Sequence, residues 1–338
     1  MKILLSSHFF HPSVGGIEEV SQVLATEFVR AGHEVKIITT TREDDGSAFP
    51  FEIVRRPGPL RLLALVRWCD VFFHNNTSLR AAWPLLLLRR PWVVAHHTWI
   101  ERVKTNRQTL RDRLKHRVIR CARNIAVSKP LAQHLVDTPS VVIGNPYRDA
   151  LFVRDPQAVR DRDLVFLGRL VVDKGVDLLL DALALLKKEK FTPTLTIIGS
   201  GPEKENLRRQ TDVLGLTAQV NFAGTQTGRK LVALLNRHQL VVLPSRWQEP
   251  FGLAALEGVA CGCVGVVADC GGLPDAIGPG GVKFVHRSVE SLTTRLRELL
   301  SPGADLRRFR EGAAAHLRAH RAEEVARRYL EVLEAAVR

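Results

Sequence analysis

Short apolar runs alternate with segments of helical period along the first part of the chain. Residues 2–6 form an apolar run typical of a buried strand, and residues 16–30 carry apolar side chains at helical spacing. Residues 34–39 form the next strand-like run, so the chain opens as a strand, a helix and a second, parallel strand. Further runs of this kind lie at residues 71–73, 92–95, 124–127 and 141–143. The pattern predicts a doubly wound parallel sheet.

The same alternation starts again after a break in the middle of the chain. Residues 146–163 lose the periodicity and are rich in charge and proline, which indicates a linker. A second series of strand-like runs follows, at residues 164–168, 195–199, 240–243, 264–268 and 282–285. The tail, residues 321–337, has a helical pattern with one apolar face. We therefore expect an α/β protein with two similar Rossmann-like lobes that face a cleft.

Length and composition favour two ordinary globular domains. The chain has 338 residues, more than a single core usually supports, and 45% of them are hydrophobic. No apolar run reaches the roughly 20 residues that span a bilayer, and the N-terminus lacks the pattern of a signal peptide. We expect a cytoplasmic protein. Its five cysteines are then reduced thiols, since the Cys261-x-Cys263 pair has no second ligand pair nearby for a metal.

The net charge of +14 is concentrated in the first part of the chain. Residues 1–150 hold 22 basic and 13 acidic side chains, against 27 and 22 in the remainder. Residues 101–123 contain nine basic side chains and place Leu110, Leu114, Val118 and Cys121 on one face of a helix. Such a helix either lies on an anionic membrane, at the inner face of the cytoplasmic membrane, or packs on the core with a solvated outer face. The charge alone also allows nucleic-acid binding, but no recognition motif supports it.

The stretch EPFGLAALEGVACGCVGVV, residues 249–267, carries the most specific candidate chemistry. A Glu-Pro-Phe-Gly turn precedes a helix that holds a second carboxylate, Glu257. The N-terminus of such a helix presents unpaired backbone N–H groups and a partial positive charge, which suit a phosphate. Glu249 and Glu257 would then hold hydroxyl groups of a phosphate-linked sugar. Our hypothesis is that this stretch forms part of a nucleotide-sugar site.

Loops that follow other predicted strands offer further candidates. Gly15 and Gly16 at the start of a helix would let backbone amides approach an anion closely, although such a pair also serves in tight turns. Arg169 follows the strand that ends at Gly168, and Lys174 comes five residues later, so two cations would converge on a diphosphate. The alternative is two solvated surface charges. His96 and His97 follow the apolar strand WVVA. Residues 197–207 look like a phosphate loop, although Pro202 and the acids after it point to a plain strand–turn–helix connection.

Five motifs in order, FHPSVGGIE, GRLVVDKG, IGSGPE, PSRWQEPFGLAALEGVACG and GGLPD, resemble the retaining GT-B glycosyltransferases of family 4. The resemblance covers nearly the whole chain. It implies an acceptor-side lobe at residues 1–150, a donor-side lobe at 151–319, and a C-terminal helix at about 320–338 that packs back on the first lobe. Departures from the family pattern are Cys263, Asp275 and the Gly144-Asn145-Pro146 hinge, which affect packing and linker geometry.

The resemblance also implies a role for each candidate residue. Arg169 and Lys174 would hold the donor diphosphate in place of a metal ion, so that the only cofactor-like group is the UDP-, GDP- or ADP-sugar itself. Glu249 would bind the donor sugar and Glu257 the ribose. The remaining expectations concern donor contacts by the backbone amides of Phe251, Gly252 and Leu253, by the Gly15–Gly16 loop, and by His97 in preference to His96.

The expected reaction is transfer of a hexosyl unit, with retention, to a saccharide or lipid-linked acceptor. A sugar-nucleotide epimerase has the same two-lobe architecture and is the alternative from another enzyme class. An epimerase binds the nucleotide sugar but transfers it to no acceptor, so acceptor-dependent release of nucleoside diphosphate separates the two.

Overall fold

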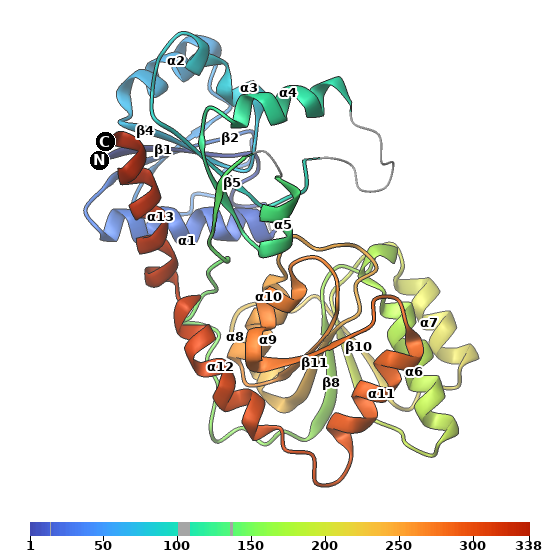
Figure 1. Cartoon of the computed structure of the whole chain (residues 1–338). Coiled ribbons are helices and arrows are strands. Elements are labelled where there is room, and N and C mark those ends of the chain that lie inside the picture. The colour runs from blue at the N-terminus through green and yellow to red at the C-terminus, as the bar shows by residue number, and fades with distance from the viewer. Residues whose placement is uncertain (14, 101–108, 136–137) are drawn as a thin grey trace. The chain divides into compact units, whose positions relative to one another are not determined.

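The computed structural model describes residues 1–13, 15–100, 109–135 and 138–338 (Figure 1). Its contacts divide the chain into two units. Unit 1 consists of Met1–Pro146 and His320–Arg338, and unit 2 of Tyr147–Ala319. Each unit is an α/β structure built on a parallel sheet.

The sheet of unit 1 has the strand order β3-β2-β1-β4-β5-β6-β7. Its central strands β4 and β5 are buried throughout and mostly apolar, because helices cover both faces of the sheet, as parallel sheets require. The strands are β1 (Lys2–Ser7), β2 (Glu34–Thr39), β3 (Glu52–Arg55), β4 (Val71–Asn75), β5 (Trp92–His96), β6 (Arg123–Ala126) and β7 (Ser140–Val142). The helices are α1 (Gly16–Arg30), α2 (Pro59–Trp68), α3 (Leu79–Ala82), η1 (Trp83–Leu86), α4 (Leu110–Ile119), α5 (Lys129–His134) and α13 (Ala322–Val337).

The sheet of unit 2 has the order β10-β9-β8-β11-β12-β13. Its strands are β8 (Arg162–Leu167), β9 (Leu195–Ile198), β10 (Val220–Gly224), β11 (His238–Leu243), β12 (Val264–Ala268) and β13 (Gly281–Phe284). Its helices are η2 (Val172–Lys174), α6 (Val176–Lys188), α7 (Lys204–Val213), α8 (Gly228–Arg237), α9 (Leu253–Ala260), α10 (Leu273–Ile277), η3 (Gly278–Gly280), α11 (Val289–Leu300) and α12 (Arg307–Ala319).

The C-terminal helix α13 belongs to unit 1, where it lies beside α1 (Figure 1). Its apolar stripe of Val325, Tyr329 and Leu333 is buried, and the Tyr329 ring meets that of Phe73 on β4 with 5.7 Å between centroids. The helical pattern of the tail is therefore confirmed, and the stripe is explained by its burial against the sheet.

The predicted C-terminal boundary of the linker, residues 146–163, is wrong, and hydrogen bonds hold the linker to other parts of unit 2. Strand β8 already begins at Arg162, because Arg162 pairs in register with His238 of β11. Before it, the Asp155 amide donates to Asn236 Oδ1 at 2.8 Å, and Arg160 Nη1 donates to the His238 carbonyl at 2.6 Å. These long-range hydrogen bonds fix a stretch that has no helical or strand period of its own.

The predicted basic helix of residues 101–123 begins later, at Leu110, and residues 101–108 lie outside the described part of the chain. Thr109 and Asp112 form a capping box at its start, which explains where the helix begins. Leu114, expected on the buried face, is 49% exposed, and Cys121 is exposed beyond the helix end. Val118 packs on the core as expected. The apolar face is thus only partly buried.

Candidate functional site

The loops after β8 and β11 meet at the point in unit 2 where the strand order reverses. From β8 the chain builds β9 and β10 on one side, and then returns with β11 on the other side. Ligands of open α/β sheets bind outside the carboxyl ends of the strands at such a switch point. The two loops are residues 168–175 and 244–252, and they hold Arg169, Lys174 and Glu249.

Lys174 and Glu249 form an ion pair between these loops. Lys174 Nζ lies 2.9 Å from Glu249 Oε1, and the two side chains are 22% and 11% exposed. Ser245 Oγ also donates a hydrogen bond to Glu249 Oε1. The carboxylate is thus oriented from two sides in a place largely shielded from water, where charge interactions are stronger than at the surface. The structure brings together two predicted site residues that are far apart in the sequence.

Glycines bring the two loops into backbone contact. Gly175 has φ +67°, and a Cβ on it would lie 2.1 Å from the Pro244 carbonyl oxygen. The Arg246 amide donates to the Asp173 carbonyl at 2.9 Å. In the same way a Cβ on Gly271 would lie 2.3 Å from the Glu249 carbonyl oxygen. Only glycine fits these positions, so the motifs GRLVVDKG and GGLPD hold the loop around Glu249 in place.

Arg169 and Glu257 occupy contrasting environments in the same unit. Arg169 is exposed just beyond β8, and no described carboxylate lies within 4.0 Å of it in an ion pair. Glu257 is 8% exposed inside α9. Helix α9 starts at Leu253 after Gly252, which has φ +129°, and no side chain caps its start. Phe251 is buried and anchors the turn. This helix start therefore offers backbone amides to an anion.

The connection of residues 197–207 supports this arrangement from β9. A Cβ on Gly199 would lie 1.8 Å from the Gly168 carbonyl oxygen, and one on Gly201 would lie 2.3 Å from that of Leu170. The Leu170 amide donates to the Ser200 carbonyl at 2.9 Å. These glycines are explained by close packing against the loop that carries Arg169.

In unit 1, the predicted phosphate loop ends at α1. Gly15 precedes the helix with extended backbone and has no side-chain cap. The Glu18 carboxylate folds back over this start, with Oε2 only 2.4 Å from where a Cβ of Gly15 would be. An acid in the first turn is favoured by the helix dipole. An anion at Gly15 and Gly16 would therefore require Glu18 to change rotamer, a condition that the motif did not reveal.

His96 and His97 are both buried at the end of β5, and each is oriented by an asparagine. His97 Nε2 lies 2.6 Å from Asn75 Oδ1, and His96 Nε2 lies 2.8 Å from Asn124 Oδ1. Because an amide oxygen only accepts, Nε2 carries the proton in both rings. Burial lowers the pKa of His97 to about 3 and that of His96 to about 4.

His97 is therefore a neutral imidazole whose Nδ1 is a lone-pair acceptor. This Nδ1 is buried, with no hydrogen-bond partner among the residues that the structure describes. On the other side of the ring, Asn75 Nδ2 donates to Ser21 Oγ at 2.6 Å, and Ser21 Oγ donates to Ser7 Oγ at 2.8 Å. This chain of hydrogen bonds fixes the ring.

Two family models account for nearly the whole chain. Residues 148–316 match the family described as glycosyl transferases group 1, and residues 14–149 match glycosyltransferase family 4. The chain belongs to the glycosyl transferases group 1 family. The expectation of a family 4 glycosyltransferase is thereby confirmed.

Curated relatives and solved structures agree with this family. The chain is 38% identical over 151 residues to a glycogen synthase of Mycobacterium tuberculosis, a match of 44% of this chain and 36% of the relative. It is 32% identical over 198 residues to a D-inositol 3-phosphate glycosyltransferase of Mycobacterium leprae, over 54% of this chain and 46% of the relative. The chain thus spans less than half the length of these relatives.

The solved structures cover the chain almost completely. A sucrose-phosphate synthase of Thermosynechococcus elongatus superposes with a TM-score of 0.81 at 20% identity, covering 99% of this chain and 98% of that one. Anabaena HepE in complex with UDP-glucose superposes with a TM-score of 0.79 at 20% identity, covering 99% and 100%. These likenesses confirm the GT-B fold.

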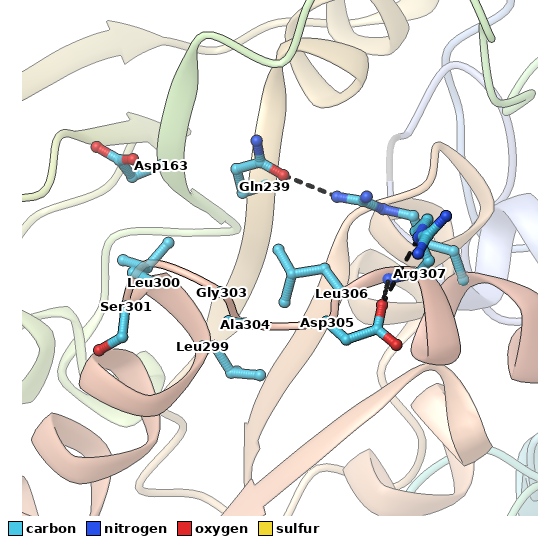
Figure 2. Close-up of a pocket in the computed structure, with 11 residues that line it drawn as sticks. Asp163, Gln239, Leu299, Leu300, Ser301, Gly303, Ala304, Asp305, Leu306 and Arg307 are labelled. Atoms are coloured by element: carbon cyan, nitrogen blue, oxygen red, sulfur yellow. Dashed lines mark hydrogen bonds and ion pairs between the residues drawn. The ribbon is translucent and has the colours of Figure 1, made fainter.

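A separate hollow of about 600 Å³ lies at the opposite, amino edge of the unit 2 sheet (Figure 2). Asp163 and Gln239, near the starts of β8 and β11, line it together with the loop between α11 and α12. Arg310 Nη2 donates a hydrogen bond to Gln239 Oε1 at 2.8 Å. The hollow lies away from the loops that hold Lys174 and Glu249, so it is not part of the predicted donor site.

Sequence reasoning missed the residues that orient the predicted ones. Ser245 lies in the motif PSRWQEPFGLAALEGVACG, four residues before Glu249, so the sequence already places it near that carboxylate. Asn75 and Asn124 gave no such signal, because their partners lie 22 and 28 residues away. In the described ranges, no group of three His, Cys, Asp or Glu side chains is placed to hold a metal ion. Those same ranges contain no helix long and apolar enough to cross a membrane.

Proposed function

We propose that this glycosyltransferase transfers a hexosyl unit, with retention and without a metal ion, from a nucleoside-diphosphate sugar to a saccharide or lipid-linked acceptor. Its place would be cell-envelope glycan or glycolipid synthesis. The observation that carries the proposal is the Lys174–Glu249 pair at the carboxyl edge of β8 and β11. A fixed cation and an uncapped helix start suit the diphosphate of a nucleotide sugar. The shielded carboxylate beside them suits the hydroxyl groups of its sugar.

Lys174 and Arg169 would supply the stabilisation of the leaving group. As the bond from the anomeric carbon to the phosphate oxygen breaks, negative charge develops on the departing nucleoside diphosphate. Preorganised cations aimed at that charge lower the barrier. The acceptor oxygen forms the new bond on the same face of the sugar, and its proton passes to the leaving phosphate oxygen. Two cations would thus serve the role of a metal ion.

The acids would bind and orient the donor. Glu249, held by Lys174 and Ser245, would accept hydrogen bonds from sugar hydroxyl groups. Glu257 would hold the ribose, and the amides of Phe251, Gly252 and Leu253 would face the donor at the start of α9. In unit 1, His97 Nδ1 would accept a hydrogen bond from a donor hydroxyl, and the Gly15–Gly16 start of α1 would contact phosphate once Glu18 moves aside.

A nucleotide-sugar panel tests the proposal directly. UDP-, GDP- and ADP-hexoses are incubated with the protein and with candidate saccharide or lipid-linked acceptors, and release of nucleoside diphosphate is measured. Anabaena HepE was crystallised with UDP-glucose, which supports testing that donor first. Release that needs an acceptor supports transfer. Conversion of the donor to an epimer, with no release, would instead establish the epimerase.

Lys174→Ala tests the role of the cation. We expect kcat to fall about 100-fold or more, by analogy with loss of one preorganised donor in other active sites. Lys187→Ala is the matched control, since its ammonium lies at the surface and donates to the Gly215 carbonyl. Equal kcat in the two variants would contradict the metal-free mechanism.

We further propose peripheral attachment to the inner face of the cytoplasmic membrane through residues 101–123. The described part of this segment supports it with exposed Arg113 and Arg117 around the half-exposed Leu114. Co-sedimentation with vesicles tests it. Binding to phosphatidylglycerol vesicles that exceeds binding to phosphatidylcholine vesicles is expected, and equal binding to both would remove the electrostatic argument.

A further inference from the structure

An exposed aromatic residue follows β1 at the carboxyl edge of the unit 1 sheet. Phe9 is 50% exposed, and its ring meets the exposed His8 ring edge-on with 4.4 Å between centroids. The next residue, Phe10, is fully buried against Phe49 and Phe51. Phe10 therefore anchors this loop in the core, whereas Phe9 is exposed to solvent.

The backbone that presents Phe9 is held rigidly. The His8 carbonyl accepts hydrogen bonds from the Thr40 amide at 3.0 Å and from the Thr39 hydroxyl at 3.2 Å. The Phe9 carbonyl accepts from Ser7 Oγ at 2.6 Å, and the Phe10 amide donates to Thr41 Oγ1 at 3.0 Å. Since the backbone is fixed, little conformational entropy is lost when a ligand binds the ring.

Polar groups end the neighbouring strands at the same edge. Ser7 pairs with Asn75, so Asn76 follows β4, the strand adjacent to β1. Asn75 pairs with Ala95, so Thr98 follows β5, one strand further from β1. The Asn76 amide lies 3.0 Å from Thr98 Oγ1, and Thr98 is exposed. Asn76 has φ +91°, an unfavourable backbone angle for a residue other than glycine. Such strain persists where the surrounding structure imposes it, often at ligand sites.

We propose that Phe9 is a stacking platform for the acceptor, and that the acceptor presents a pyranose ring. One face of a pyranose carries axial C–H groups, which pack on the Phe9 ring, while its hydroxyl groups hydrogen-bond with Asn76 and Thr98. An exposed aromatic surface, with an amide and a hydroxyl at the ends of the next two strands of the sheet, has the chemistry of a sugar site rather than that of a lipid-chain site. This inference rests on the proposed transferase function and narrows its acceptor to saccharides.

Binding of simple glycosides provides a test that needs no knowledge of the natural acceptor. The probes are methyl α-D-glucopyranoside, methyl α-D-galactopyranoside and methyl α-D-mannopyranoside, observed by saturation-transfer-difference NMR on the full-length protein. At least one is expected to receive saturation, strongest at the protons of one ring face. Phe9→Ala is expected to abolish the effect and Phe9→Trp to restore it. Leu60→Ala, at an 84% exposed position of the same unit, is the matched control and should keep it.

Kinetics with an acceptor found in the donor panel provide the second readout. Phe9→Ala should raise the acceptor KM about tenfold, the loss expected for one aromatic contact, with the donor KM unchanged. Unchanged acceptor KM and NMR signals in Phe9→Ala would overturn the platform, and so would a wild-type protein that binds none of the glycosides. Failure of wild type to release nucleoside diphosphate from any donor would instead refute the transferase function.

Discussion

His74 is a buried histidine whose replacement should make the protein more stable to acid. It lies on β4, is fully buried, and neither ring nitrogen has a hydrogen-bond partner among the residues that the structure describes. Its ring packs edge-on against Phe72 and Trp92, with centroids 4.3 and 5.5 Å away. Burial lowers its pKa to about 3. A phenylalanine would match these aromatic neighbours better than an imidazole.

The magnitude follows from proton linkage. At pH 7.5 the imidazole is neutral in both states, so its ionisation does not affect stability. As the pH falls through the unfolded pKa of about 6.5, the unfolded state takes up a proton that folded His74 does not bind, and the free energy of unfolding decreases. At pH 5.0 this loss is about 2 kcal/mol for a folded pKa of about 3. Burial lowers the pKa values of His96 and His97 in the same direction, so they decrease the free energy of unfolding as well. At pH 5.0 the three histidines together lower the free energy of unfolding of unit 1 by about 6 kcal/mol.

His74→Phe should remove one third of this acid sensitivity. At pH 7.5 we expect a gain of about 1 kcal/mol, because an unsatisfied buried polar ring is removed, and at pH 5.0 a gain of about 3 kcal/mol. Urea unfolding followed by tryptophan fluorescence measures both values. Four of the five tryptophans, Trp68, Trp83, Trp92 and Trp99, lie in unit 1, so the signal reports mainly on that unit.

The control is the same substitution at a hydrogen-bonded histidine. His238 in unit 2 donates from Nδ1 to the Leu234 carbonyl at 2.6 Å and accepts at Nε2 from Thr196 Oγ1 at 2.9 Å. His238→Phe should therefore destabilise its unit, since it leaves these groups unpaired. An equal loss of stability between pH 7.5 and 5.0 in His74→Phe and wild type would refute the linkage argument.

Three further predictions test other parts of the structure. Gly175→Ala should lower the melting temperature by well over 5 °C, because its Cβ would overlap a backbone carbonyl. Gly32 has φ +85°, and a Cβ there would meet no described atom within 4 Å beyond its chain neighbours, so Gly32→Ala should cost only about 1 kcal/mol in a thermal melt. Tyr329→Phe removes a buried hydroxyl that has no partner among described residues, so urea unfolding should show no loss of stability. Asn75→Ala leaves the His97 N–H unpaired and should cost about 2 kcal/mol by the same assay; an unchanged midpoint would contradict the assigned hydrogen bond.

Much of the fold could be predicted because its signals are local. Strands buried on both faces read as apolar runs, and helices show their apolar stripe at 3.6-residue spacing, so both lobes and the tail helix were foreseen. The edge strands β3 and β10 were missed. Their exposed or half-buried residues carry no apolar run, and only pairing with β2 and β9 makes them strands.

The candidate site shows the same division. The sequence alone determined the family, the motifs, and the placement of Lys174 and Glu249 after separate strands, because those features are written in contiguous residues. Only the tertiary structure decided that these two side chains form an ion pair, that Asn75 sets the tautomer of His97, and that Glu18 covers the start of α1. The physical reason is that an ion pair or a hydrogen bond depends on distances of a few ångströms between side chains, and only the packed sheets set those distances.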